Sequence, residues 1–308
     1  MKKYILKFLA LAVALLIPFA AYYGYAQSLP AQFGGSIMGT VRHKIGLLQN
    51  TPSPRVILAG GSSSPYATNC EEIGQALGMP CINIGATAYL GVEFYLSMLE
   101  DAMRPGDVIV IAPEHSMLAD AVDYQTVWSA VENFPEVWAV VPPGYWPAMA
   151  TQYFQYGQAK LDLYKTQGDA TPAYHADFGP LGDVTLERET LLEAGYIRDD
   201  PIALGPGTLD DGVVHALNRF AAKAEQAGAT VYFAFAPVDK LAITTTPDQW
   251  QALEARIRNE INLPVLGTLP DAVMDGAYFY DSNNHLTTEG ARLYSARLID
   301  LLQAELLY

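Results

Sequence analysis

The chain has 308 residues, of which 51% are hydrophobic and 17% are charged. That is enough apolar material for one substantial domain or two small ones, and it excludes an intrinsically disordered protein. The 18 Lys and Arg face 33 Asp and Glu, a formal net charge of −15, so the chain repels phosphate backbones and nucleic acid is not an expected partner. Two cysteines and five scattered histidines exclude a disulfide scaffold and a cysteine-rich zinc module, and no metal is expected.

The N-terminus has the pattern of an export signal. Three lysines, at positions 2, 3 and 7, precede an uncharged apolar run over residues 8–26, which is long enough to cross a bilayer as a helix. The lysines predict a cytoplasmic N-terminus and a main domain outside the cytoplasm. Two interpretations remain open. The run is either an uncleaved signal anchor with an aromatic belt of tyrosines at its outer end, or a signal peptide cleaved after Ala26, which releases a secreted or periplasmic domain.

We divide the chain into a signal anchor over residues 1–26, a linker over residues 27–54 and one domain over residues 55–308. The linker is rich in Gly and Pro, and only residues 41–48 have an amphipathic pattern, so we expect a stalk. Removing residues 1–26 removes three lysines and no acid, which leaves a net charge of −18. The exported part should therefore not bind an anionic membrane surface by charge.

Strands and helices alternate along the domain. Short apolar runs predict strands that are buried on both faces, and amphipathic segments between them predict helices, the first with Asn69 as N-cap and Gly78 as C-terminal stop. The predicted strands cover residues 55–59, 81–84, 107–112, 230–236 and 264–266. The predicted helices cover residues 69–78, 92–103, 210–228, 247–261 and 287–306. This alternation predicts an α/β fold with a parallel sheet and right-handed crossovers.

An interruption over about residues 114–207 separates the two halves of this pattern. It is rich in Trp, Tyr and Pro, and a structureless loop of that length inside a domain is improbable. We expect a mostly helical insertion above the sheet. Its aromatic side chains either shape a substrate groove or only pack together.

Cys70 and Cys81 flank the first predicted helix of the domain. About ten helical residues separate them by roughly 15 Å, which is beyond the reach of a disulfide. We therefore expect two free thiols even in an oxidising compartment.

Polar residues follow the predicted strands at the ends where parallel sheets bind ligands. Ser62 follows two glycines after the first strand, Gly85 follows the second, and Asp281 and His285 precede the last helix. A serine, a histidine and a carboxylate supply a nucleophile, a general base and an orienting group, and backbone N–H groups near the serine stabilise an oxyanion. Each motif alone has a plainer interpretation, since a Gly-Gly-Ser-Ser-Ser run suits a turn and an Asp-rich loop suits a helix cap.

Four segments carry a resemblance to a known family: Val56-Ile-Leu-Ala-Gly-Gly-Ser62, Cys81-Ile-Asn-Ile-Gly85, Arg104 to Glu114, and Asp281 to His285. Together they resemble the SGNH (GDSL-like) hydrolase superfamily, and most closely its membrane-anchored, DltD-like or polysaccharide-acetylation-associated members. The similarity covers roughly residues 55–114 and 203–308. It implies a three-layer α/β/α, flavodoxin-like fold, no cofactor, and acyl-ester hydrolysis or acyl transfer.

The resemblance implies that Ser62 is the nucleophile, His285 the base and Asp281 its partner, with an oxyanion hole from the N–H groups of Gly85 and of the Ser62–Ser63 turn. Three departures stand out. Gly61 replaces an Asp that many members have. The third strand ends in Ala-Pro-Glu-His instead of Gly-x-Asn-Asp, and losing the oxyanion side chain can cost about 10² or more in rate. Asp281 lies four residues before His285 instead of three, and Ser282 occupies the nearer position.

Ser63 is a rival nucleophile, in a register where Gly61-Ser62-Ser63 replaces Gly-Asp-Ser. Glu114 and His115 stand at the end of the third predicted strand, beside the expected site. They are either a plain surface pair or a pair that contacts the substrate or tunes the charge of the site.

Three functions fit these observations. The first is a membrane-tethered serine esterase or O-acyltransferase acting on an acylated cell-envelope glycopolymer. The second is a non-catalytic scaffold that positions the polymer for a membrane-embedded acyltransferase, as the missing oxyanion Asn indicates. The third is a solute-binding module. A distance of about 3 Å between the Ser62 hydroxyl and the His285 imidazole favours catalysis, and one beyond about 6 Å favours the scaffold.

Overall fold

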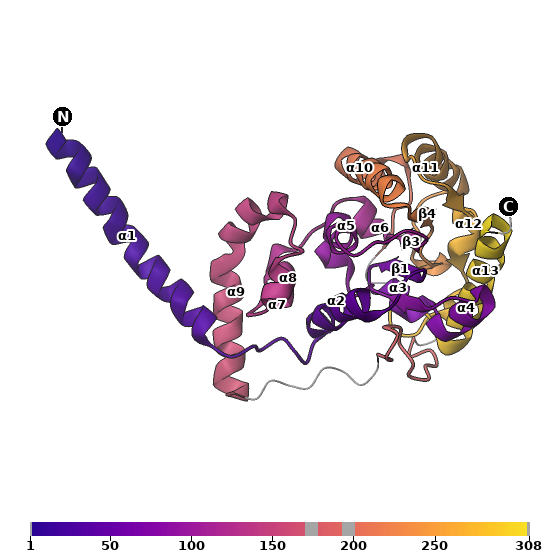
Figure 1. Cartoon of the computed structure of the whole chain (residues 1–308), viewed down its shortest axis with the longest axis horizontal. Coiled ribbons are helices and arrows are strands. Elements are labelled where there is room, and N and C mark those ends of the chain that lie inside the picture. Colours follow the sequence, from indigo (N-terminus) through magenta and orange to yellow (C-terminus); the bar gives the residue numbers. More distant parts are fainter. Residues whose placement is uncertain (1, 170–177, 193–200, 307–308) are drawn as a thin grey trace.

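The centre of the fold is a five-stranded parallel sheet (Figure 1). The computed structural model describes residues 2–169, 178–192 and 201–306. The strands are β1 (Val56–Gly60), β2 (Cys81–Asn83), β3 (Val108–Ala112), β4 (Thr230–Ala234) and β6 (Val265–Leu266). Each of them overlaps a strand predicted from the sequence, and the α/β class with a parallel sheet is confirmed.

The strand order places a topological switch point between β1 and β3. The spatial order is β2-β1-β3-β4-β6, and β1 pairs in parallel with a strand on each side. The chain passes from β1 to β2 at one edge and then crosses to β3 and the other half of the sheet. Open parallel sheets bind ligands at the carboxyl ends of the strands where the winding reverses. The residues that follow β1 and β3 are therefore the first place to look for a site.

Alternate strand residues enter two separate hydrophobic clusters, one on each face of the sheet. Ile57 and Ile109 belong to the first cluster, whereas Val56 and Val108 belong to the second. Helices α2 (Thr40–Asn50), α5 (Val92–Glu100), α10 (Asp211–Ala227) and α11 (Pro247–Glu260) contribute to the first. Helices α3 (Ser63–Ala67), α4 (Cys70–Leu77) and α13 (Thr288–Leu306) contribute to the second. Because both faces are covered, the strands are continuously apolar in sequence.

The ends of the helices follow their capping signals. The side chain of Asn69 accepts hydrogen bonds from the N–H groups of Glu71 and Glu72, and Gly78 ends α4 with φ 67°, as the sequence predicts. The other elements lie in the insertion and between the later strands. They are α6 (His115–Leu118), α7 (Tyr124–Val131), α8 (Pro135–Trp138), α9 (Trp146–Gln167), α12 (Leu269–Ala272), and a two-stranded sheet of β5 (Val238–Asp239) and β7 (Val273–Met274).

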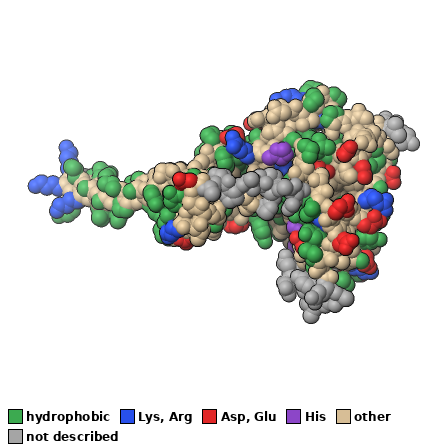
Figure 2. Space-filling model, turned by 90° about the horizontal axis from the view of Figure 1, so that it is seen from below, with side chains coloured by type: hydrophobic (Ala, Val, Ile, Leu, Met, Phe, Trp, Pro, Cys, Tyr) green, Lys and Arg blue, Asp and Glu red, His purple; other side chains and the backbone are tan. Residues whose placement is uncertain are grey.

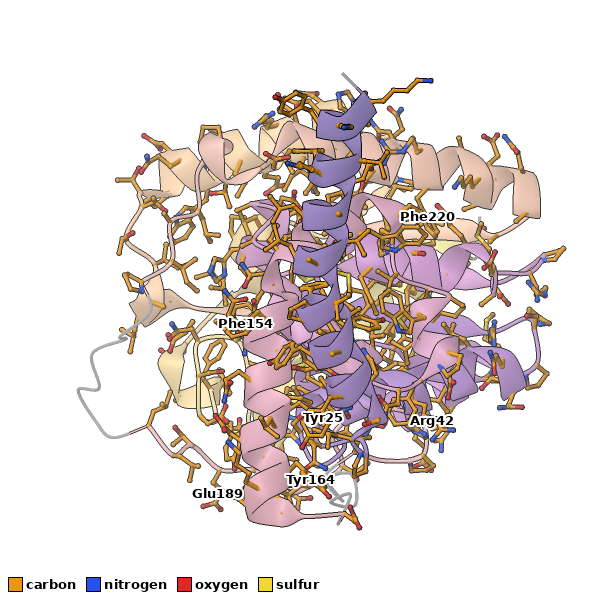
Figure 3. All side chains as sticks on the ribbon, turned by 90° about the vertical axis from the view of Figure 1, so that its left-hand side faces the viewer. Tyr25, Arg42, Phe154, Tyr164, Glu189 and Phe220 are labelled. Carbon is orange, nitrogen blue, oxygen red and sulfur yellow. The ribbon has the colours of Figure 1, made fainter. Side chains whose placement is uncertain are left out.

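Helix α1 (Lys2–Ser28) projects away from the rest of the chain, with apolar side chains along its length and basic ones at its free end (Figures 1 and 2). Within the described residues it is the one helix long and apolar enough to cross a membrane, a test that a signal sequence also passes. Its last turns pack on α9, where the rings of Tyr22 and Tyr23 contact Tyr153 and Tyr22 also contacts Phe154. Figure 3 shows the two helices side by side near Phe154.

The region predicted as a stalk is partly folded into the domain. Residues 40–50 form α2, whose Val41, Ile45 and Leu48 side chains are buried in the first hydrophobic cluster. Its amphipathic pattern is therefore that of a helix covering the sheet rather than of an isolated segment in a linker.

The described part of the insertion is mostly helical, as predicted. Helices α7, α8 and α9 lie between α1 and the sheet (Figure 1). Four of their aromatic side chains pack on one another: Trp128, Trp138, Tyr153 and Tyr156. Trp128 stacks on Tyr156 with ring centroids 5.4 Å apart, and Tyr153 and Tyr156 are fully buried. These aromatic residues form a core, so the substrate-groove interpretation does not hold for them.

The expectation that Cys70 and Cys81 are far apart is wrong. The thiols are free and buried, yet they are close enough for a hydrogen bond, and burial, followed by this bond, raises the pKa of Cys70. The helix between them, α4, has only eight residues. Strand β2 begins against the middle of this helix, since a Cβ added to Gly74 would lie 3.6 Å from the Cβ of Cys81. The chain returns toward the start of the helix, so the length of the helix does not set the separation.

Candidate active site

Ser62 lies just beyond the carboxyl end of the central strand β1. The chain leaves β1 at Gly60, passes Gly61 and reaches Ser62, which is the N-cap of α3. A Cβ on Gly60 would collide with the backbone of Ala112 at the end of β3, and a Cβ on Gly61 would collide with the Glu114 carboxylate. The two glycines therefore let the chain turn against β3 and present the Ser62 hydroxyl at the switch point.

His285 hydrogen-bonds to Ser62 and Asp281 at the same time. Its Nε2 lies 2.8 Å from Ser62 Oγ, and its Nδ1 lies 2.7 Å from Asp281 Oδ1. Because an ionised carboxylate only accepts, Nδ1 carries the proton and Nε2 accepts the hydroxyl proton of Ser62. The structure thus brings together the three residues predicted as nucleophile, base and orienting carboxylate, in the geometry that such a triad requires.

The four-residue spacing between Asp281 and His285 does not prevent their contact. Ser282 Oγ accepts a hydrogen bond from the backbone N–H of His285 at 3.2 Å, which closes a tight loop and points both side chains the same way. Burial raises the pKa of Asp281, but the hydrogen bond and charge of His285, with help from the Asp281 backbone and Ser282, hold the pKa of that carboxyl below its usual range. Asp281 is therefore anionic at neutral pH and can orient the imidazole.

Tyr66 and Arg188 hold the imidazole from the side. The Tyr66 ring stacks on the His285 ring with centroids 4.0 Å apart and an interplanar angle of 10°. The Arg188 guanidinium lies over Tyr66 at 5.3 Å and donates to the carbonyl of Leu286 at 3.1 Å. Arg188 is itself buried, so this network fixes both the ring and the loop that carries it.

The geometry favours Ser62 over Ser63 as the nucleophile. The Ser63 side chain is fully buried, and its hydroxyl has no hydrogen-bond partner among the described residues. Ser62 in contrast is partly exposed and touches the imidazole. Successive residues at the start of α3 point in different directions, so only one of the two serines can face His285.

Gly85 is not a free oxyanion donor, which corrects the prediction. Its N–H donates to Asn83 Oδ1 at 2.8 Å, and the Asn83 amide donates in turn to Ser64 and Thr68 at 3.1 and 2.9 Å. The requirement for glycine is steric, because a Cβ at position 85 would lie 2.8 Å from Gly61 O and from Ser64 Cβ. Gly85 and Asn83 thus pack the serine turn against β2.

The Ser63 N–H, the other predicted donor, is also occupied. It donates to Glu114 Oε1 at 2.7 Å. Among the hydrogen bonds of the described residues, none uses the N–H of Ser62. Of the predicted oxyanion donors, the Ser62 N–H is therefore the one without an acceptor in residues 2–169, 178–192 and 201–306.

Glu114 is buried beside the nucleophile rather than placed at the surface. It is 5% exposed, and its Oε1 lies 3.4 Å from Ser62 Oγ. His115, the next residue, begins α6 and is partly exposed, and both residues line a small cavity with Asn284. Glu114 therefore contacts the site directly.

Three residues around the site were missed in the sequence. Asn83 had a signal, because a lone amide inside an apolar strand has to find buried partners. Tyr66 and Arg188 had no such signal in the sequence, since their roles depend on tertiary contacts with His285 and with each other. Arg188 lies in the insertion, far along the chain from both the serine turn and the histidine loop.

No group of three or more His, Cys, Asp or Glu side chains in residues 2–169, 178–192 and 201–306 is arranged to hold a metal ion. No protein-family model matches the chain, and no curated protein matches it. What the protein does has therefore to be inferred from the geometry of the site itself.

Proposed function

We propose that the protein is an exported, membrane-anchored serine esterase or O-acyltransferase of the SGNH hydrolase type, with a three-layer α/β/α domain. The observation that carries the proposal is the hydrogen-bonded chain from Ser62 through His285 to Asp281, with distances of 2.8 and 2.7 Å. Its position at the switch point of a parallel sheet supports the same conclusion.

The chemistry follows from this arrangement. Ser62 Oγ attacks the carbonyl carbon of an acyl ester while His285 Nε2 takes the hydroxyl proton, and the imidazolium is stabilised by Asp281. The tetrahedral intermediate collapses when His285 returns the proton to the leaving alcohol, which leaves an acyl group on Ser62. Water then completes hydrolysis, or an acceptor hydroxyl completes transfer, with His285 again as the base.

The substrate class is an acylated cell-envelope glycopolymer. Helix α1 and its docking on α9 support a retained anchor, because Ala26, the residue before the potential cleavage point, is 1% exposed and belongs to the core. A domain held at a membrane meets polymers of the envelope. The net charge of −18 beyond residue 26 favours a neutral or cationic polymer.

One observation favours a second candidate, a non-catalytic scaffold that assists a membrane-embedded acyltransferase. The N–H groups of Gly85 and Ser63 both have acceptors, and no Asn stands at the end of β3. The short distance between Ser62 and His285 argues against this candidate, because a scaffold has no need for a nucleophile held against a base.

Labelling with a fluorophosphonate probe tests the proposal. The wild-type protein in detergent should be labelled at Ser62 and should hydrolyse p-nitrophenyl acetate, and Ser62→Ala should lose both properties. Ser63→Ala is the matched control and should keep them, because the Ser63 hydroxyl is buried away from His285. Equal labelling of the wild type and Ser62→Ala would contradict the enzyme. An unlabelled wild type would also contradict it, unless a substitution beside Ser62 restores the labelling. In cells, an unchanged phenotype for Ser62→Ala would support the scaffold.

A further inference from the structure

Glu114 places a carboxylate beside the nucleophile, where acyl-transfer enzymes usually place hydrogen-bond donors. It follows β3 directly, on the strand that borders β1 at the switch point. Its Oε1 accepts the Ser63 N–H at 2.7 Å and lies 3.4 Å from Ser62 Oγ. The hydroxyl of Ser62 therefore lies between two acceptors, the His285 imidazole at 2.8 Å and the more distant Glu114 carboxylate.

Gly61 leaves the space that the Glu114 carboxylate occupies. A Cβ at position 61 would collide with Glu114 Oε1, and it would stand 2.8 Å from Glu114 Cδ and 3.0 Å from Ala88 Cα. No side chain larger than hydrogen fits there while Glu114 keeps this conformation. The position of the Glu114 carboxylate therefore requires a glycine at position 61.

The carboxylate has no cationic partner in the described part of the chain. It is 5% exposed, and no ion pair of the described residues includes it. Burying an acidic side chain without a counter-charge is costly, and the one hydrogen bond from the Ser63 N–H offsets only part of that cost. The Glu114 side chain also lines a small cavity together with His115 and Asn284. This cavity is the space into which the carboxylate can move away from Ser62.

An occupied donor and a nearby negative charge both oppose acyl transfer. When Ser62 Oγ attacks, charge develops on the carbonyl oxygen of the acyl group, and catalysis requires donors aimed at that oxygen. With Glu114 in this position the Ser63 N–H is not free, and the carboxylate repels the developing oxyanion.

We infer that Glu114 is a gating residue of this active site. In the resting protein it occupies the oxyanion side of Ser62, and a bound substrate has to displace it toward the cavity before the acyl group can react. This inference depends on the proposed function, because it assigns Glu114 a role in the reaction of Ser62. Glu114 acts through the Ser63 N–H and the local charge, so it is a positioning residue and not a catalytic one.

Two variants of the full chain in detergent test the inference. Glu114→Gln keeps the size and the acceptor for the Ser63 N–H but removes the charge, and Glu114→Ala also frees the N–H. We expect Glu114→Gln to raise kcat for p-nitrophenyl acetate and the rate of fluorophosphonate labelling at Ser62 roughly tenfold, because the charge that opposes the developing oxyanion is removed while the Ser63 N–H stays occupied. A freed oxyanion donor, as in Glu114→Ala, is worth about 10² to 10³ in rate. KM and Tm should change little. Glu114→Ala should be at least as fast as Glu114→Gln, and Glu225→Gln, an exposed glutamate on α10, is the control.

The outcomes separate this inference from the proposed function. If the wild type is labelled at Ser62 and neither Glu114 variant is faster, the gate is refuted and the enzyme stands. A slower Glu114→Gln with an unchanged Tm would show that the charge assists the reaction, which also refutes the gate. If neither the wild type nor the variants are labelled, the proposed function fails, and the gate fails with it. Labelling of the variants alone would support both.

Discussion

Lys44 is buried so completely that its titration should be visible in the stability of the protein. Its side chain is 0% exposed on α2, and its Nζ donates to the carbonyls of Asn83, at 3.0 Å, and Gly182. Burial lowers the pKa of Lys44 to about 7, although the nearby Cys70 and Asp183 oppose the shift. Replacing it by methionine removes the titrating group and keeps the length of the side chain.

The sign of the effect follows from proton linkage. Below pH 7 both the folded and the unfolded chain hold the proton on Lys44, so this group causes no change of stability with pH there. Between pH 7 and the unfolded pKa of 10.5 only the unfolded chain holds it, so the free energy of unfolding rises with pH. The total difference is about 5 kcal/mol at about 1.4 kcal/mol per pKa unit, and about 2 kcal/mol of it develops between pH 7 and pH 9.

Urea unfolding followed by tryptophan fluorescence, with the full chain in detergent at pH 7, 8 and 9, measures this effect. The wild type should gain about 2 kcal/mol relative to Lys44→Met over this range. Lys240→Met, at an exposed lysine, is the control. The difference in the free energy of unfolding between the wild type and Lys240→Met should not change with pH. A difference between the wild type and Lys44→Met that stays constant with pH would refute the argument from burial.

Three further predictions concern the site and helix α1. Asp281→Asn should lower kcat for p-nitrophenyl acetate by about 10² to 10⁴, because the Asn side chain favours the wrong tautomer of the His285 imidazole while Ser62 keeps its position. A loss of less than threefold would contradict the role of Asp281. Gly85→Ala should lower the free energy of unfolding by about 1 to 3 kcal/mol in urea, because its methyl group meets Gly61 O and Ser64 Cβ at 2.8 Å, and an unchanged midpoint would contradict the packing argument. Gly157→Ala should lower the Tm of the full chain, because the added Cβ lies 2.7 Å from the Tyr22 hydroxyl. The same substitution should leave the Tm of a chain without residues 1–26 unchanged, and equal effects on both chains would contradict the docking of α1 on α9.

The strands and the major helices were predictable because their determinants are local. A strand covered on both faces needs an unbroken apolar run, and a helix end needs a cap such as Asn69 or Gly78, so both can be recognised within a few residues. The alternation of strands and helices then leaves few topologies other than a parallel sheet. In such a sheet Ser62 and His285 had to come near the same edge.

The direction of each side chain was not predictable, because it depends on contacts between distant segments. Ser62 and Ser63 are equivalent in the sequence, and only their positions on α3 relative to the histidine loop distinguish them. The sequence is compatible with Gly85 as an oxyanion donor, but in the structure the Gly85 N–H donates to the side chain of Asn83, two residues away. Cys70 and Cys81 meet because β2 folds back under α4.

By itself, then, the sequence determined an acidic α/β protein with a long apolar N-terminal helix and a serine, a histidine and an aspartate near the ends of its strands. The tertiary structure alone decided what surrounds them. It buried Glu114 beside Ser62, stacked Tyr66 on His285 and joined the end of α1 to α9. The physical reason is range. Hydrophobic periodicity and capping act over a few neighbours in the chain, whereas burial, charge and hydrogen bonds at the site depend on residues that lie 52 positions apart, as Ser62 and Glu114 do, or 223 positions apart, as Ser62 and His285 do.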